Sequence, residues 1–317
     1  MIVVVCPGQG SQTPGFLAPW LERPDFAADL AEISDEVGID LRAHGTVSDS
    51  DTIRDTAIAQ PLIVAAGLLT VKALLAEGRH AGVAGIAGHS VGEITAAAGA
   101  GILSAADAMR FVRERGKAMA QAAALAPTGM SAVIGAEESE LLSRLAELEL
   151  EPANFNGGGQ IVVAGALPAL ASLAENPPAR ARVIPLQVAG AFHTRYMRPA
   201  REHLQAVAAG LAPSDPTLPI WTNHDGSLVS SGARFLELLV GQVSSPVRWD
   251  LCMQSFADAG VTGIIEVAPA GALVGLAKRA LKGVPSVAIK TPDDLPAAWA
   301  LLEQQSSAPS KASERDA

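Results

Sequence analysis

One short segment of the chain has the residue types and the spacing of a serine nucleophile. Residues 88–92, Gly-His-Ser-Val-Gly, match the pattern G-x-S-x-G. In this pattern the two glycines let a strand turn sharply into a helix, with the serine held at the apex. Backbone amides and the positive end of the helix dipole then favour negative charge beside the hydroxyl. The segment predicts a nucleophile at Ser90, and a purely structural turn is the alternative.

A serine hydroxyl becomes a useful nucleophile only when a neighbouring base takes its proton. His193 follows Gly-Ala-Phe, just beyond a predicted strand at 182–188, and α/β folds place their sites at the carboxyl ends of strands. We therefore expect His193 to be the base, against the alternative of an ordinary loop histidine. The other histidines are expected in solvated segments, on a surface helix, or turned away from the serine: His44, His80, His224, His203 and His89.

Arg115 lies among apolar residues on one face of a predicted helix at 105–124. A cation on an apolar face costs free energy unless it is paired. One interpretation is a buried salt bridge with a carboxylate of the protein. The other is a carboxylate on the substrate, which the rigid fork of arginine binds through two parallel hydrogen bonds. The sequence leaves both interpretations open.

The loop at residues 7–12, Pro-Gly-Gln-Gly-Ser-Gln, follows the first predicted strand. Its backbone amides could form an oxyanion hole together with the amide of Val91. A phosphate-binding loop is not indicated, because the pattern G-x-x-x-x-G-K-[ST] is absent and the third glycine of G-x-G-x-x-G is missing.

The elements that must position these residues alternate between strand and helix, which predicts an open, mostly parallel sheet. The expected strands lie at 2–6, 83–87, 219–222 and 262–267. The expected helices lie at 60–76, 91–99, 105–124, 197–210, 232–243 and 250–259. We expect the first of these helices to begin at Gln60-Pro61 and the third to be capped by Ser104.

The pattern changes near residue 128 to the order β-α-β-β-α-β, which is a split βαβ, ferredoxin-like unit. Its strands are expected at 130–134, 153–156, 161–164 and 182–188, and its helices at 137–148 and 167–173. We therefore expect a small domain at 128–189, inserted into a catalytic core made of residues 1–127 and 190–300. Residues 305–317 are rich in Ser and Ala and are expected to form a disordered tail.

Composition excludes several classes of protein. The 317 residues are 49% apolar and 18% charged, with 33 acidic and 23 basic side chains and a net charge of −10. Such a chain can bury a sizeable core and argues against a nucleic-acid partner, which needs a basic surface. Its two cysteines fit neither a disulfide framework nor a zinc motif, so we expect reduced thiols and no metal. We expect neither a signal peptide nor a membrane span.

Together these segments resemble one family, the malonyl-CoA:acyl carrier protein transacylases with the acyltransferase domains of polyketide and fatty acid synthases. The matching stretches are 7–12, 60–61, 88–93, 115–116, 154–156, 159–160, 190–193, 246–247 and 266–269, together with Gln242. They follow the family's order along most of the chain. The resemblance implies an α/β fold, with an α/β-hydrolase-like core, a mostly parallel sheet and an inserted ferredoxin-like subdomain.

The resemblance implies a role for each of five residues. Ser90 is similar to the nucleophile that carries the malonyl group as an ester, and His193 to the base that activates it. In the family a backbone carbonyl orients this histidine, and here that carbonyl belongs to Gln242. The backbone amides of Gln9 and Val91 match the oxyanion hole.

The resemblance also implies the substrate. Arg115 matches the arginine that binds the malonyl carboxylate, and acetyl-CoA would leave that buried cation unpaired. Phe192 matches a bulky residue that leaves no room for a 2-methyl branch. The implied reaction is ping-pong transfer of malonyl from malonyl-CoA to the phosphopantetheine thiol of acyl carrier protein, in fatty acid or polyketide synthesis. We expect a cytoplasmic monomer without a cofactor.

Two other functions remain open at this point. A serine hydrolase or thioesterase would use the same elbow and pass the acyl group to water, and a non-catalytic carrier-protein binding module would not react at Ser90. An acidic carrier protein that docks on an acidic chain requires a local basic patch. The candidate patches are Arg180 with Arg182, Arg195 with Arg198 and Arg201, and Lys278 with Arg279 and Lys282.

Overall fold

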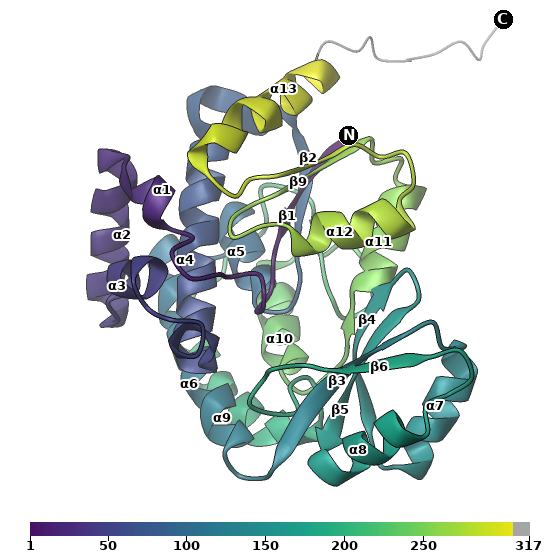
Figure 1. Ribbon diagram of the computed structural model, residues 1–317. Helices are drawn as coiled ribbons and strands as arrows, with labels where there is room; N and C mark the ends of the chain where they lie inside the picture. The colour runs from purple at the N-terminus through teal and green to yellow at the C-terminus, as the bar shows by residue number, and fades with distance from the viewer. Residues whose placement is uncertain (307–317) are drawn as a thin grey trace, which may run out of the picture.

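The structure is a computed structural model that describes residues 1–306 (Figure 1). At its centre is a sheet of five strands in the order β10-β9-β1-β2-β7, and every neighbouring pair is parallel. The strands are β1 (Ile2–Cys6), β2 (Val83–Gly88), β7 (Ile220–Trp221), β9 (Gly263–Glu266) and β10 (Ser286–Ala288). The prediction of an α/β fold with a mostly parallel sheet is confirmed.

The central strand β1 is buried along its whole length because helices cover both faces of the sheet. Ile2, Val4 and Cys6 pack into one apolar cluster, whereas Val3 and Val5 pack into another. Successive side chains of a strand point to opposite faces, so a continuous β-branched run can serve both layers.

The helices that surround the central sheet are α1 (Ala18–Leu21), α2 (Pro24–Val37), α3 (Leu41–Thr46), α4 (Thr56–Leu75), α5 (Gly92–Gly99), α6 (Ala105–Ala123), α9 (Arg198–Ala208), α10 (Gly232–Gln242), α11 (Trp249–Asp258), α12 (Ala272–Ala280) and α13 (Leu295–Ser306). The first apolar cluster includes residues of α4, α5, α6 and α13, and the second includes residues of α11 and α12. Short 3₁₀ turns are η1 (Thr52–Arg54), η2 (Ala76–Gly82), η3 (Arg195–Met197) and η4 (Pro292–Asp294).

Helix α4 begins earlier than the sequence predicts. The side chain of Asp55 accepts a hydrogen bond from the Ala57 amide and caps the helix, so Pro61 lies inside it rather than at its start. With the following η2 turn, α4 forms a stretch long and apolar enough to cross a membrane by length and composition alone. Its most apolar window is 72% buried inside the protein, so its side chains are used in packing against neighbouring helices.

A second sheet has the order β6-β3-β5-β4-β8. Its elements are β3 (Thr128–Ile134), α7 (Glu138–Glu147), β4 (Glu151–Gly157), β5 (Gln160–Ala166), α8 (Leu167–Glu175), β6 (Arg182–Pro185) and β8 (Val247–Arg248). Its first four strands are antiparallel to their neighbours, the pairing of a split β-α-β-β-α-β unit. The fifth strand, β8, comes from outside residues 128–189 and pairs in parallel with β4. The expected inserted segment therefore does not supply the whole sheet.

Two further expectations differ from the structure. The strand expected at 182–188 ends at Pro185. The tail expected at 305–317 begins too early, because α13 continues to Ser306, and the rest of that segment lies outside the described residues. The helices α1 to α3, α12 and α13 and the short strands β8 and β10 were not predicted from the sequence.

Candidate active site

The predicted elbow forms where β2 ends at Gly88 and α5 begins at Gly92. Ser90 has a φ of 53°, in the left-handed region that a non-glycine residue adopts only when its surroundings hold it there. A Cβ at Gly92 would lie 2.1 Å from the carbonyl oxygen of Cys6, and a Cβ at Gly88 would lie 2.0 Å from the carbonyl carbon of Gly92. Both glycines are therefore required by close backbone contact.

Asn223, which the sequence reading missed, closes the elbow. Its Oδ1 accepts from the Ser90 amide at 2.8 Å, and its Nδ2 donates to the Gly88 carbonyl at 2.7 Å. The side chain thus stabilises the strained turn from both sides. The loop after β7 provides it, 133 residues away in sequence from Ser90, and a lone asparagine there gives no sequence signal.

The structure brings the predicted nucleophile and base together. His193 Nε2 lies 2.7 Å from Ser90 Oγ, and His193 Nδ1 lies 2.8 Å from the backbone carbonyl oxygen of Gln242. A carbonyl can only accept, so Nδ1 carries the ring proton and Nε2 is left to accept the serine proton. The predicted orienting carbonyl therefore lies in the required place.

His193 is held in an unusual environment. It is 4% exposed, its φ is 62°, and its backbone amide donates to the Val243 carbonyl at 3.1 Å. Burial, and next the positive charge of Arg115, lower the pKa of His193 to about 3. The imidazole is therefore neutral near pH 7, which is the form that a general base needs.

Arg115 is completely buried on α6, beside Ser90. Its Nη1 donates to Gln60 Oε1 at 2.7 Å, its Nη2 donates to Gln242 Oε1 at 2.8 Å, and Nη2 also lies 3.4 Å from Ser90 Oγ. Its Nε has no hydrogen-bond partner, and in the part of the chain that the structure describes Arg115 forms no ion pair. The buried salt bridge considered from the sequence is therefore not present.

Two buried amides and one buried carboxylate around Arg115 were not assigned a role from the sequence. Gln60 was noted only as part of a matching dipeptide, and Gln242 only for its backbone carbonyl, but both side chains hold the guanidinium. Glu93, in the first turn of α5, is 1% exposed. Burial raises the pKa of Glu93 to about 7, against hydrogen bonds from the Asn223 amide and the Gln242 side chain. Glu93 was noted only as the last residue of the matching stretch 88–93, because the G-x-S-x-G pattern itself ends at Gly92.

A cavity of about 530 Å³ opens onto these residues. Its wall combines Ser90, His193 and Arg115 with Met130 and Asn156 of the second sheet. Helix α12 closes another side through its apolar face and Arg279. The cavity is therefore built by both sheets, and its mixed polar and apolar lining is typical of a small-molecule site.

The cavity wall also includes Gln9, Val91 and Phe192. Among residues 1–306 the backbone amides of Gln9 and Val91 donate no hydrogen bond, whereas the Ser90 amide is taken by Asn223. The two amides are thus available to an oxygen of a bound substrate. Phe192 is 6% exposed and fills the wall directly before His193.

His89 points away from the attack line of Ser90, as expected. Its Nε2 lies 2.9 Å from Asn156 Oδ1 on β4, and its ring meets Trp249 edge-on. Burial lowers its pKa, so the ring is neutral and links the elbow to the second sheet. Of the remaining histidines, His203 is exposed beside Glu114, His80 and His224 are exposed, and His44 is half-buried against Ser48.

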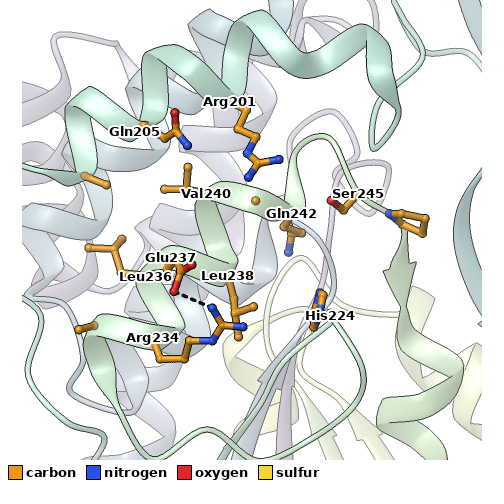
Figure 2. Close-up of a pocket in the computed structure, with 14 residues that line it drawn as sticks. Arg201, Gln205, His224, Arg234, Leu236, Glu237, Leu238, Val240, Gln242 and Ser245 are labelled. Carbon is orange, nitrogen blue, oxygen red and sulfur yellow. Dashed lines mark hydrogen bonds and ion pairs between the residues drawn. The ribbon is translucent and has the colours of Figure 1, made fainter.

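A second cavity of about 460 Å³ lies between α9 and α10 (Figure 2). Figure 2 shows Arg201 and Arg234 at its edge, with Arg234 paired to Glu237. Neither Ser90 nor His193 lines it. It holds no nucleophile and base in contact, so the first cavity is the candidate active site.

The described residues hold no group of three or more His, Cys, Asp or Glu that could bind a metal ion. Cys6 and Cys252 are free and buried, and burial raises the pKa of both thiols. A thiol kept protonated in this way is a poor nucleophile. The two thiols are therefore not candidate nucleophiles, whereas Ser90 and His193 lie in hydrogen-bond contact.

Comparisons with known proteins place the chain among acyl transferases. Residues 3–293 match the acyl transferase domain family. The chain is 52% identical over 299 residues to the malonyl CoA-acyl carrier protein transacylase of Mycobacterium tuberculosis, covering 93% of this chain and 98% of that protein. The crystal structure of MCAT from Mycobacterium tuberculosis matches with a TM-score of 0.91 at 51% identity, over 94% of this chain and 99% of that one. A solved complex of a malonyl-transacylase with its type II PKS acyl-carrier protein matches with a TM-score of 0.90 at 31% identity, over 94% and 99%.

Proposed function

The chain belongs to the acyl transferase domain family, and on that premise we propose that it transfers malonyl from malonyl-CoA to the phosphopantetheine thiol of an acyl carrier protein. This is the reaction for which its relative from Mycobacterium tuberculosis is named. The proposed pathway is fatty acid synthesis, with polyketide synthesis as the alternative. Transfer between two thiols through an enzyme ester is ping-pong chemistry.

In the proposed first half-reaction, Ser90 Oγ attacks the thioester carbonyl of malonyl-CoA while its proton passes to His193 Nε2. The 2.7 Å contact between these atoms supports that transfer. The developing oxyanion accepts from the backbone amides of Gln9 and Val91. The tetrahedral intermediate then collapses, the bond to sulfur breaks, and His193 returns the proton to the coenzyme A thiolate.

The second half-reaction runs the same steps with the carrier-protein thiol as the nucleophile. His193 takes the thiol proton, the thiolate attacks the malonyl ester, and the departing Ser90 oxygen receives the proton. The carbonyl of Gln242 holds the imidazole throughout and stabilises its charged form. No step requires a metal ion or a cofactor.

Arg115 selects malonyl in this proposal. Its buried guanidinium has two neutral amide acceptors and an unpartnered Nε, so a substrate carboxylate would complete its pairing. Phe192 narrows the cavity beside His193 and disfavours a branch on the acyl group. One extra methyl group changes the transition-state binding free energy by only about 1–3 kcal/mol, so selection by Phe192 is weaker than selection by Arg115.

The proposal also includes the domain boundaries, oligomeric state, localisation and partners that the sequence predicts. We propose residues 1–127 and 190–300 as the catalytic core and 128–189 as a ferredoxin-like subdomain, with β8 joining the second sheet from the core. The protein is proposed to act as a cytoplasmic monomer with malonyl-CoA and carrier protein as partners, and without nucleic acid or membrane.

The single observation that carries the proposal is a serine–histidine pair beside a buried arginine that has no ion-pair partner among residues 1–306. The test is intact-protein mass spectrometry after incubation with malonyl-CoA. We expect one malonyl adduct, mapped to Ser90, that is absent from Ser90→Ala and is discharged by carrier protein. Rapid release of free malonate without carrier protein would instead identify a hydrolase, and a protein without an adduct or fluorophosphonate labelling would be a binding module.

A further inference from the structure

One buried carboxylate beside the site has no part in the proposed steps. Glu93 Oε1 accepts from the Asn223 backbone amide at 2.7 Å. Its Oε2 accepts from Nε2 of Gln242 in a short hydrogen bond. Buried carboxylates are costly unless they are paired or fully hydrogen-bonded, so a carboxylate here needs a reason.

The side chain of Gln242 lies between Glu93 and Arg115. Its Nε2 faces the carboxylate, and its Oε1 accepts from Arg115 Nη2 at 2.8 Å. A carboxylate only accepts hydrogen bonds and a guanidinium only donates them. Only one orientation of the amide satisfies both neighbours, so Glu93 and Arg115 together fix the Gln242 side chain.

This arrangement places a negative charge near Arg115 without putting a carboxylate in direct contact with its guanidinium. A carboxylate in direct contact would take the donors that a substrate carboxylate needs. Here the negative charge lies one side chain further away, and only neutral amide oxygens of Gln60 and Gln242 touch the guanidinium. The attraction of Glu93 nevertheless favours the charged form of Arg115.

We propose that Glu93 is a positioning residue that acts through the Gln242 side chain to hold Arg115 charged and aimed at the substrate carboxylate. The inference rests on the proposed role of Arg115 in binding malonyl. Glu93 touches neither substrate nor reacting atoms. A merely structural role is the competing explanation, because Glu93 also holds the Asn223 backbone and so supports the elbow.

The test is Glu93→Gln, which keeps the size of the side chain and removes its charge, assayed at pH 8, where a carboxyl with a pKa of about 7 is mostly ionised. We expect the malonyl-CoA concentration for half-maximal acylation of Ser90 to rise by about 10-fold, the effect of losing a charge-assisted hydrogen bond, with kcat changed by less than about 3-fold. Preference for malonyl over acetyl falls by a similar factor. Labelling of Ser90 by a fluorophosphonate, which has no carboxylate, stays within about 3-fold of the wild-type rate.

The matched control is Glu266→Gln, which neutralises another buried carboxylate. Glu266 accepts from the backbone amides of Gly271, Leu273 and Val274 at the start of α12 and does not contact Gln242. Its variant should lower thermal stability and leave the malonyl preference unchanged. Equal losses with malonyl-CoA and fluorophosphonate in Glu93→Gln, or no loss with either, would overturn the inference.

A double-mutant cycle tests the route through the amide. Gln242→Met removes the amide and keeps the backbone carbonyl that orients His193. If Glu93 acts through this amide, adding Glu93→Gln to Gln242→Met changes the half-maximal concentration by less than about 2-fold, because coupled changes are not additive. Additive effects overturn the inference. If Glu93→Gln does not fold, Gln242→Met alone must show the malonyl-specific loss.

The proposed function and this inference fail in different ways. A wild-type protein that forms no malonyl ester on Ser90 refutes the proposed function. A wild-type protein that forms the ester, with a Glu93→Gln variant of unchanged malonyl preference, refutes only the role of Glu93.

Discussion

At the scale of single residues, a cation and a base share one small buried space. Arg115 Nη2 and His193 Nε2 both approach Ser90 Oγ, at 3.4 and 2.7 Å. The positive charge of Arg115 is one cause of the low pKa of His193, after burial. A malonyl carboxylate bound at Arg115 would offset that charge and make His193 more basic. Recognition of the acyl group and activation of the serine are therefore linked through charge.

The lowered pKa of His193 predicts the pH dependence of serine reactivity. With a pKa of about 3 the imidazole stays neutral across the range from pH 8 to pH 5. Fluorophosphonate labelling of Ser90 should therefore change little between pH 7 and pH 5. An ordinary histidine with a pKa near 6.5 would lose reactivity by about 25-fold over the same range, and a fall of that size would contradict the prediction.

The same shift has a consequence for stability, with a definite sign. The folded protein favours neutral His193, so this group stabilises the fold above the unfolded histidine pKa of about 6.5 and the contribution is lost as pH falls toward 3. His193→Gln removes this dependence. We expect the urea midpoint of the wild type to fall more steeply below pH 6.5 than that of the variant, and parallel curves would contradict the pKa shift.

We expect substitution of Arg115 to change substrate selectivity rather than to lower activity with all substrates. In Arg115→Ala we expect kcat/KM for malonyl-CoA to fall by about 10³-fold or more, because a site built for a charged group loses its partner, while acetyl-CoA is little affected. Arg115→Lys should recover only part of the preference, since lysine lacks the planar fork. The measurement is the ratio of kcat/KM for malonyl-CoA and acetyl-CoA, and an unchanged ratio would remove Arg115 from the site.

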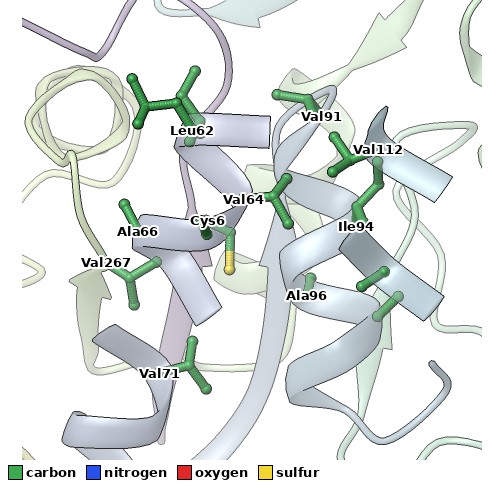
Figure 3. Packing of buried hydrophobic residues seen from close by; sticks show 14 of the residues in the cluster. Cys6, Leu62, Val64, Ala66, Val71, Val91, Ile94, Ala96, Val112 and Val267 are labelled. Atoms are coloured by element: carbon green, nitrogen blue, oxygen red, sulfur yellow. The ribbon is translucent and has the colours of Figure 1, made fainter. Parts of the chain in front are cut away.

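At the scale of elements, the elbow depends on close packing between β1, β2 and α5. Figure 3 shows Val91 and Ile94 of this region in the same apolar cluster as Cys6 at the end of β1 and Val64 of α4. The backbone at Gly92 approaches the Cys6 carbonyl so closely that no side chain fits between them. The position of Ser90 is therefore set by packing as well as by the turn.

This packing predicts a contrast between two glycines in helices. Gly92→Ala should lower the free energy of unfolding by about 3 kcal/mol, the upper range for overpacking a core, and should slow fluorophosphonate labelling of Ser90. Gly275→Ala in α12 meets no atom within 4 Å and should raise stability by about 0.5–1 kcal/mol. Urea denaturation measures both, and equal stabilities would show that the elbow tolerates a wider backbone spacing.

The sequence could predict the elements whose signals are local. The β-branched run of β1, the glycine-flanked Ser90 and the Ser104 cap all lie within a few residues and were found close to their observed positions. The start of α4 was wrong because Asp55 caps the helix several residues before Pro61. Strand β8 has only two residues and exists because β4 lies beside it, so its own sequence carries no signal.

The residues of the site also fall into those with a local sequence signal and those without one. Ser90, His193 and Arg115 each stood out by motif, context or an unexpected charge on an apolar face. Glu93 and Asn223 did not, because their importance comes from contacts with residues far away in sequence, such as the 149 positions between Glu93 and Gln242. A buried carboxylate cannot be recognised until the fold shows what surrounds it.

At the scale of the whole molecule, the active site lies where the two sheets meet. The first sheet supplies the elbow, the second supplies Asn154 and Asn156 to the cavity wall, and β8 joins the two parts of the chain. His89 bonded to Asn156 adds a direct link between them. A carrier protein must bring its thiol to this junction, so its docking surface has to lie near the mouth of the cavity.

The charge of the molecule then predicts how docking responds to salt. The chain carries a net charge of −10. If this net charge governed docking, an acidic carrier protein would be repelled. Of the three candidate basic patches, the one on α12 includes Arg279, which lines the cavity, with Lys278 and Lys282 exposed beside it. Arg195 is instead paired with Glu151. We therefore expect local attraction to dominate and the KM for carrier protein to rise as salt screens it.

The measurement is the KM for carrier protein between low and moderate ionic strength, with the double variant Lys278→Glu and Lys282→Glu as the test. We expect the variant KM to rise by about 10-fold at low salt, and the difference from wild type to shrink as the Debye length shortens. Lys117→Glu, on α6 and outside the cavity wall, is the control for a single added acidic charge. A wild-type KM that falls with added salt would mean that the net charge decides, because screening then relieves repulsion rather than weakening attraction.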